Sequence, residues 1–380
     1  MSWHLMKDDL RDVAYGATFL GAGGGGTLSS TLNMIERHFP LDELVRLVTV
    51  EEASQEDGLT AVCGMIGSQT VGHDLENPLA AGYAVDRFRR LMQETGRGEV
   101  KRLIPMELGV QSAAVPNFIL ALSRGMSVVD GDGAGRAVPT SMNTTYAGYG
   151  PSPCPAVGAT DTGVTVITEA GGVNMYSEVM RGMAMRQDIG IVGVSLWPMD
   201  GPTLLRAVPA RGGLSTAREI GRALRNDGVK DKVGTVLRIL TDKGHWAKEL
   251  FRGRLDDVLT PVMDYSTVVV AGSDGATYNV KTAGESVVAY KGNDRIGMGP
   301  DSMCWMTPSG ETCSNTEVQK YKGKEVVLIG IAANEALRKS EFIMSYFKLF
   351  LNKVEDDPKK NLPTRVEHFT DYIPIEKLHS

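Results

Sequence analysis

The sequence predicts an α/β protein with an N-terminal, mainly parallel sheet that carries helices on both faces, followed by a β-rich α+β domain. Up to about residue 150, short apolar runs alternate with amphipathic helical patterns, which is typical of a parallel sheet between two helix layers. From about residue 246, short β-type runs follow one another between Gly and Asp turns, as in an antiparallel sandwich or barrel. The length of 380 residues fits two ordinary domains.

In the N-terminal part, apolar residues at helical spacing predict helices over 7–19, 27–38, 78–95 and 113–125. Strands are predicted over 44–50, 59–67, 100–107 and 126–130. A proline-rich linker, "YGPSPCP" at 149–155, precedes a change in the pattern of predicted strands and helices. We therefore expect an N-terminal domain at 1–168, a β-rich domain at 169–335 and a C-terminal tail at 336–380.

After the linker, the pattern predicts a strand over 163–169, a Met-rich helix over 174–188, a strand over 189–197 and helices at 201–208 and 215–227. The β-rich part then contains predicted strands at 248–260, within 264–282, and at 285–292, 294–307 and 324–333. Methionine fills cores and subunit contacts equally well. The Met-rich helix is therefore expected to pack in the core, and a homo-oligomer stays open.

Composition excludes several classes of protein. The formal net charge is −6, and no basic face is visible that would bind nucleic acid. No apolar run of about 18 residues predicts a membrane span, and charges in the first turns argue against a signal peptide. The four cysteines form no CxxC pair, so a disulfide framework or zinc ribbon is not expected. We expect a cytoplasmic protein.

A glycine run, "LGAGGGGTLSS", separates the first two predicted helices. Because each glycine costs conformational entropy, four in a row (Gly23, Gly24, Gly25 and Gly26) indicate a need for close backbone approach. Their N–H groups, together with Thr27 at the start of the next helix, could cradle an anion or oxyanion. A tight corner between two helices is the alternative. No Gly-Lys-Ser/Thr follows, so a nucleotide phosphate loop is the weakest interpretation.

Carboxylates follow the predicted strands. Asp130 ends the strand at 126–130 and Asp132 follows it, while Glu107 ends the strand at 100–107. His73 follows the strand at 59–67. The carboxyl ends of parallel strands share one rim, where ligands bind in α/β sheets, so these side chains are expected to meet there. Acids near Arg136 would have separated pKa values, as a proton-transferring site requires.

Two further side chains are candidates for the same site. Asn117, at the start of the helix at 113–125, could point to the same rim, and Glu285, at a strand start, could reach a cleft from the second domain. The histidine and carboxylates are also hard or borderline metal ligands. No HxH or HExxH spacing supports zinc, so a divalent metal stays open and no cofactor is implied.

Several segments together resemble one family. "FLGAGGGGT" at 19–27, "MIGSQTVG" at 65–72 and "SVVDGDGAGRAVP" at 127–139 occur in the same order as its signatures. "ESVVAY" at 285–290, "GPDSMCWM" at 299–306 and "EVVLIGIAA" at 325–333 match more loosely. The family is the one long called DUF917, whose characterised branch is S-methyl thiohydantoin desulfurase.

The resemblance implies a hydrolase for a small five-membered cyclic imide or thioimidate, of the hydantoin or S-methyl thiohydantoin type. Asp132 is the first candidate base and Glu107 the second, while Arg136 and the glycine amides would stabilise negative charge. Asp130 would orient Arg136 or bind the ring. Thr140 to Asn143 depart from the family pattern. The alternative is therefore a non-catalytic, ring-binding subunit that partners a hydantoinase- or oxoprolinase-like enzyme.

Overall fold

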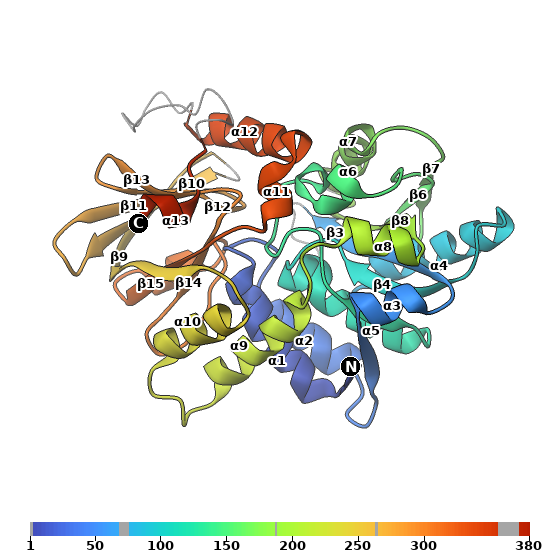
Figure 1. Cartoon of the computed structure of the whole chain (residues 1–380), viewed down its shortest axis with the longest axis horizontal. Coiled ribbons are helices and arrows are strands. Elements are labelled where there is room, and N and C mark those ends of the chain that lie inside the picture. Colours follow the sequence, from blue (N-terminus) through green and yellow to red (C-terminus); the bar gives the residue numbers. More distant parts are fainter. Residues whose placement is uncertain (1–2, 68–75, 187, 263–264, 356–371) are drawn as a thin grey trace.

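The computed structural model describes residues 3–67, 76–186, 188–262, 265–355 and 372–380. Figure 1 shows two sheets side by side, with the N-terminal α/β part on one side and the antiparallel sheet on the other. The first sheet has eight strands in the order β1-β2-β5-β4-β3-β8-β6-β7. The second has seven, in the order β13-β12-β11-β10-β9-β15-β14.

In the first sheet, four parallel strands form a central block, and antiparallel strands lie on both sides of it. The parallel block consists of β2 (Val45–Thr49), β5 (Ser127–Asp130), β4 (Val100–Pro105) and β3 (Leu59–Gly67). The antiparallel strands are β1 (Trp3–Leu5), β8 (Ile191–Met199), β6 (Ala156–Ala159) and β7 (Thr165–Thr168). The predicted fold class is confirmed, with a first sheet that is mixed and takes strand β8 from beyond residue 168.

Helices cover both faces of this sheet because its strands alternate side chains between two cores. Val128 points into one apolar cluster and Val129 into the other, as the twofold period of a strand requires. The first cluster is covered by α1 (Lys7–Leu20), α2 (Leu28–His38), α4 (Leu79–Glu94), α5 (Val115–Ser123), α9 (Gly213–Arg225) and α10 (Lys232–Asp242). The second is covered by α3 (Val50–Gln55), α6 (Thr145–Tyr149), α7 (Val173–Ala184) and α8 (Gly201–Ala207).

The second sheet is antiparallel throughout. Its strands are β9 (Ala247–Val262), β10 (Tyr265–Gly272), β11 (Thr277–Ala283), β12 (Glu285–Lys291), β13 (Asp294–Met298), β14 (Ser302–Met306) and β15 (Glu325–Ile331). Apolar residues of β14 and β15 join the first core cluster. The two sheets therefore share one core through the helix layer between them.

Short and C-terminal helices complete the chain: a π-helical turn η1 (Val110–Ala114), 3₁₀ turns η2 (Ser141–Asn143) and η3 (Val318–Tyr321), and α11 (Glu335–Lys339), α12 (Glu341–Glu355) and α13 (Ile375–Leu378). The segment predicted as a tail thus contributes packed structure. Ile343 and Phe347 of α12 and Ile375 of α13 are buried.

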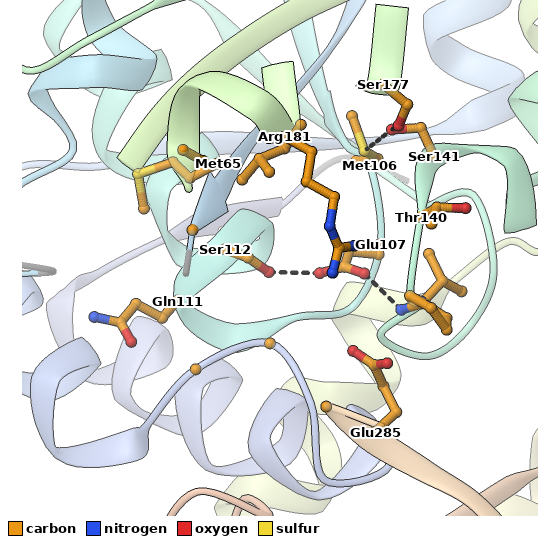
Figure 2. Close-up of a pocket in the computed structure, with 18 of the residues that line it drawn as sticks. Met65, Met106, Glu107, Gln111, Ser112, Thr140, Ser141, Ser177, Arg181 and Glu285 are labelled. Carbon is orange, nitrogen blue, oxygen red and sulfur yellow. Dashed lines mark hydrogen bonds between the residues drawn. The ribbon is translucent and has the colours of Figure 1, made fainter. Parts of the chain in front are cut away.

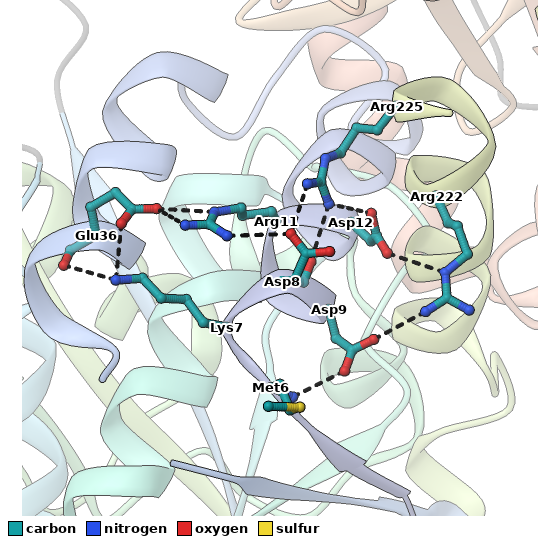
Figure 3. A network of polar contacts seen from close by, with 9 residues as sticks. All are labelled: Met6, Lys7, Asp8, Asp9, Arg11, Asp12, Glu36, Arg222 and Arg225. Carbon is teal, nitrogen blue, oxygen red and sulfur yellow. Dashed lines mark hydrogen bonds and ion pairs between the residues drawn. The ribbon is translucent and has the colours of Figure 1, made fainter. Parts of the chain in front are cut away.

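Helices α1 and α9 cross at very short range because each has a glycine at the crossing. A Cβ on Gly16 would lie 1.8 Å from the Ala217 carbonyl oxygen, and a Cβ on Gly221 would lie 1.8 Å from that of Asp12. Aspartates of α1 face arginines of α9 along this contact (Figure 3). The crossing fixes both the glycine run after α1 and the start of α9.

Candidate functional site

A cavity of about 390 Å³ lies where the two sheets meet. Its walls come from the glycine run, the ends of β3 and β4, turn η1, the loop before η2, one face of α7 and the start of β12 (Figure 2). The lining residues include Gly25, Gly26, Thr27, Met65, Met106, Glu107, Gln111, Ser112, Thr140, Ser141, Ser177, Arg181 and Glu285. This volume suits a small-molecule ligand.

The glycine run contacts the second sheet through its backbone. The Asn315 N–H donates to the Gly23 carbonyl at 2.7 Å, and the Ser286 N–H donates to the Ala22 carbonyl at 2.8 Å. A Cβ on Gly24 would lie 2.4 Å from Glu285 Oε1, so a side chain here would collide with that carboxyl group. The run is thus a close-packed corner and also a cavity wall.

Gly25 and Gly26 line the cavity and adopt φ values of +80° and +97°, which favour glycine. In the part of the chain that the structure describes, the backbone N–H groups of these two residues donate to no acceptor. Thr27 caps α2, as its side-chain oxygen accepts from the Ser30 N–H at 3.3 Å. Two residues of the cavity lining therefore have amides without an acceptor, and such amides are the donors that an oxyanion site requires.

Glu107 is held in the cavity wall by two short hydrogen bonds. The Ser112 hydroxyl donates to Oε1 and the Val138 N–H donates to Oε2, each at 2.6 Å. Burial raises the pKa of Glu107, while these two hydrogen bonds and the charge of Arg136 oppose that rise. Both carboxylate oxygens already accept a hydrogen bond, which favours an ionised Glu107.

Glu285 enters the cavity from the second sheet, as the first residue of β12. Its side chain follows Gly284, whose φ of +80° turns the chain into the strand. Among the described residues, its buried Oε2 has no hydrogen-bond partner. Burial first, and then the charge of Glu107, raises the pKa of Glu285 to about 7. Glu285 can therefore gain or lose a proton near neutral pH.

Asp130 lies outside the cavity lining and caps α9 instead. Its Oδ1 accepts hydrogen bonds from the Leu214 and Ser215 N–H groups, each at 3.0 Å, where the helix N-terminus favours negative charge. This capping occupies the carboxylate that the sequence suggested for orienting Arg136 or binding the ring.

Asp132 and Arg136 are both buried and do not line the cavity. Oδ1 of Asp132 accepts from the Ala134 and Gly135 N–H groups at 2.7 and 2.6 Å. The Arg136 guanidinium donates to four backbone carbonyls, those of Ala137, Ser286, Pro300 and Asp301. Arg136 thus links the two domains. The sequence predicted that Asp132 and Arg136 would act on the substrate, but a ligand in the cavity would touch neither side chain.

Two more predicted site residues, Asn117 and His73, are not among the described residues that line the cavity. Asn117 is buried and donates to the carbonyls of Cys63 and Ala113, so it supports β3 rather than lining the cavity. His73 lies outside the described residues. Within the described ranges, no cluster of three or more His, Cys, Asp or Glu side chains could hold a metal ion.

Sequence reasoning missed the side chains that α7 contributes. Ser177, Arg181 and Ala184 recur at helical spacing on the face towards the cavity, and Figure 2 shows Arg181 extending from α7 into the cavity. Its positive charge opposes the rise in the pKa of Glu285. The spacing was visible in the sequence, but the Met-rich character of this helix suggested core packing.

Family comparison covers both halves of the chain. Residues 8–170 match the model described as "S-Me-THD-like, N-terminal domain", and residues 173–345 match "S-Me-THD-like, C-terminal domain". The chain belongs to the S-Me-THD-like family. This confirms the resemblance to S-methyl thiohydantoin desulfurase that the glycine run and the Asp-Gly-Arg block indicated.

A solved structure supports the fold of this S-Me-THD-like protein. An X-ray crystal structure of a protein from Chromobacterium violaceum matches with a TM-score of 0.82 at 24% sequence identity, covering 98% of this chain and 100% of that one. No curated protein matches significantly. Among the described residues, no helix is long and apolar enough to cross a membrane.

Proposed function

We propose that this protein is a hydrolase for a small five-membered cyclic imide or thioimidate, of the hydantoin or S-methyl thiohydantoin type. The observation that carries the proposal is Glu285, which has a pKa of about 7 and an unpartnered oxygen in a cavity shared with Glu107. A group that titrates near the working pH is suited to general acid–base catalysis. Family membership supports a thiohydantoin-related ring.

In the proposed reaction, ionised Glu285 takes a proton from water as the water oxygen bonds to the ring carbon that carries the methylthio group. The electron pair of the C=N bond moves to the ring nitrogen, and the amides of Gly25 and Gly26 stabilise the developing negative charge. The C–S bond then breaks as C=O forms. Of the two protons of the water, one ends on the ring nitrogen and one on the sulfur, giving hydantoin and methanethiol.

Glu107 has a supporting role in this proposal. Both of its oxygens are already hydrogen-bonded, so it is a poor acceptor for a further proton. Its negative charge raises the pKa of Glu285, which places the working carboxyl near neutrality. The base role assigned first to Asp132 thus moves to Glu285, and the oxyanion role of Arg136 moves to the glycine amides.

The proposal is tested by incubating the full chain with hydantoins, 2-thiohydantoins and S-methyl thiohydantoins, while thiol release and ring opening are measured. Glu285→Gln is expected to lower turnover by about 10²-fold or more. Glu325→Gln, at an exposed strand start of the same sheet, is the matched control and should retain turnover. Saturable binding of a ring without any product would support the ring-binding subunit instead, and a pull-down would then seek a hydantoinase-like partner.

A further inference from the structure

Five carboxyl groups, those of Asp130, Asp132, Glu107, Glu285 and Asp301, form a zone in which each is reached by the charge of another member or of Arg136. Four of them are almost fully buried, and Glu107 lies in the cavity wall. The guanidinium of Arg136 is the buried cation whose charge reaches Glu107, Glu285 and Asp301. Since like charges in a low-dielectric interior raise one another's pKa values, some of these carboxyl groups are expected to hold protons up to about neutral pH.

Hydrogen bonds show which groups are stabilised as carboxylates. Asp301 accepts at both oxygens, from the Ala333 N–H and Arg338 at Oδ1 and from the Tyr372 hydroxyl and Ile375 N–H at Oδ2. Asp130 accepts from two amides at the start of α9, and Glu107 accepts at both oxygens. Hydrogen bonds to the charged form favour ionisation, so at Glu107 and Asp130 they oppose the rise in pKa that burial causes.

Among the described residues, two buried carboxyl oxygens have no hydrogen-bond partner, Oδ2 of Asp132 and Oε2 of Glu285. A buried carboxylate oxygen without a donor is costly, so a proton on each of these groups removes the largest penalty. Glu285 opens to the cavity, but Asp132 has no exposed surface and does not line it. The zone thus has one proton site that a ligand can reach and one that is sealed.

Asp132 is sealed by tight packing. A Cβ on Gly213, the first residue of α9, would lie 2.7 Å from Oδ2, so only glycine leaves room for the carboxyl group. The loop that carries Asp132 is hydrogen-bonded to the strand end next to Glu107, through the Gly133 N–H to the Met106 carbonyl at 3.2 Å and the Val138 N–H to Glu107. Asp132 is therefore placed directly behind the cavity wall.

The titratable groups that face Asp132 are Glu107 after β4, Asp130 at the end of β5 and Tyr146 on α6. Tyr146 donates its hydroxyl proton to the Pro105 carbonyl, and α9 presents Gly213, Leu214 and Ser215 here, none of which is charged. Burial first, and then the charges of Glu107 and Asp130, raises the pKa of Asp132 to about 7, against the two loop amides.

We infer that Asp132 is a sealed positioning residue that holds a proton below neutral pH: while it is uncharged, Glu107 stays ionised more easily in the cavity wall, and this sets the pH range in which Glu285 works. The proton sits on Oδ2, while Oδ1 continues to accept from Ala134 and Gly135. Above neutral pH, ionisation of Asp132 adds a second negative charge beside Glu107, and the protons of the coupled carboxyls are then lost in overlapping steps. The pH-range part of this inference rests on the proposed function, whereas the protonation of Asp132 does not.

Infrared difference spectroscopy of the full chain tests the protonation directly, because a protonated carboxyl group has a carbonyl band distinct from that of a carboxylate. In Glu285→Gln, one protonated carboxyl should remain and should titrate near pH 7, a midpoint close to the pKa of Asp132. The double variant Asp132→Asn with Glu285→Gln should lose that band. Absence of a neutral-pH titration in Glu285→Gln, or its persistence in the double variant, would overturn the inference. If the double variant fails to fold, Asp132→Asn alone should lose one of the protonated-carboxyl bands of the wild type, and an unchanged spectrum would overturn the inference.

The pH–rate profile tests the second part. Asp132→Asn keeps an oxygen that can accept from the two loop amides but carries no charge. The pH at which turnover rises should therefore be lower than in the wild type. The rise should also fit the titration of one group instead of the overlapping titrations of two. Turnover at pH 7 should fall by less than about tenfold, whereas loss of a general base costs about 10²-fold or more. A loss on that larger scale, or an unmoved transition, would contradict the positioning role. If no ring is hydrolysed by the wild type, the proposed function fails while the infrared result still stands.

Discussion

At the contact between α1 and α9, aspartates of one helix face arginines of the other, whereas Glu107 and Glu285 line the cavity without an ion pair to any residue that the structure describes. Asp8 pairs with Arg225 at 2.8 Å, and Asp12 pairs with the same guanidinium at 2.5 Å (Figure 3). Glu285 has no such partner among the described residues. The two regions use the same residue types in different surroundings.

The comparison separates the effects of pairing and burial. The hydrogen bond from Arg225 lowers the pKa of exposed Asp8, yet burial raises the pKa of Asp12 although two arginines face it. Glu285 combines burial with the charge of Glu107, and its pKa rises further, to about 7. For the buried carboxyl groups in this comparison, removal from water has the larger effect on the pKa, and ion pairs reduce that effect only in part.

The first prediction sharpens this comparison through the pH dependence of stability. The pKa values of Asp132 and Glu285, about 7 when folded, lie above the unfolded values near 4. Folded protein then binds more protons than unfolded protein between about pH 4 and 7, so the free energy of unfolding should fall as pH rises through this window. Each group contributes on the order of 4 kcal/mol to that fall across the whole window, at about 1.4 kcal/mol per pKa unit.

Urea unfolding at about pH 5 and pH 7.5 measures the effect. Glu285→Gln should show a smaller difference between the two pH values than the wild type does, because one of the two titrating groups is gone. The control Glu325→Gln should keep the wild-type difference. Equal pH dependence in all three proteins would mean that Glu285 titrates at its ordinary pKa, and the contrast between the regions would disappear.

The second prediction breaks the α1–α9 contact at its closest point. In Gly221→Ala, the new Cβ would lie 1.8 Å from the Asp12 carbonyl oxygen, so the helices must separate, at a cost of about 3 kcal/mol or more in unfolding free energy. The matched control is Gly182→Ala in α7, where no atom lies within 4 Å of the new Cβ. Because alanine is the better helix former, the control should gain up to about 1 kcal/mol. Similar costs for both changes would show that the tight crossing contributes nothing.

Much of the fold could be predicted from the sequence because it depends on local patterns of apolar residues. The apolar spacing in α1, α4 and α5 and the short runs of β3 and β5 predicted these elements within a few residues. The antiparallel insertion of β8 beside β3 was not readable, because a strand pattern does not specify its partner. Helix α10 and strand β6 were not predicted.

The candidate site could be predicted from the sequence only in part, because several of its contacts join residues that are far apart in the chain. Gly25, Gly26, Glu107 and Glu285 were singled out and do line the cavity. Asp130 and Asp132 stood beside a glycine-rich turn, a pattern equally suited to a ligand or to backbone capping. That Asp130 caps a helix that begins 83 residues later at Gly213, and that Arg136 binds backbone carbonyls of the other domain, are tertiary contacts without a sequence signal.

The last prediction concerns the exposed end of the ion network and has the smallest expected effect. Glu36 pairs with Lys7 at 2.9 Å and Arg11 at 2.5 Å, but its side chain is 50% exposed. In Glu36→Gln, Lys7 keeps its hydrogen bond to the backbone carbonyl of residue 36 at 3.2 Å, so no charge is left buried without a partner. The free energy of unfolding should therefore fall by only about 0–1 kcal/mol, and less at high salt. Glu43→Gln, on the exposed loop after α2, is the control and should change nothing. A loss of more than about 2 kcal/mol in unfolding free energy that persists at 1 M salt would mean that the network behaves like a buried ion pair. Exposed and buried carboxyl groups of this protein would then not differ in the way proposed here.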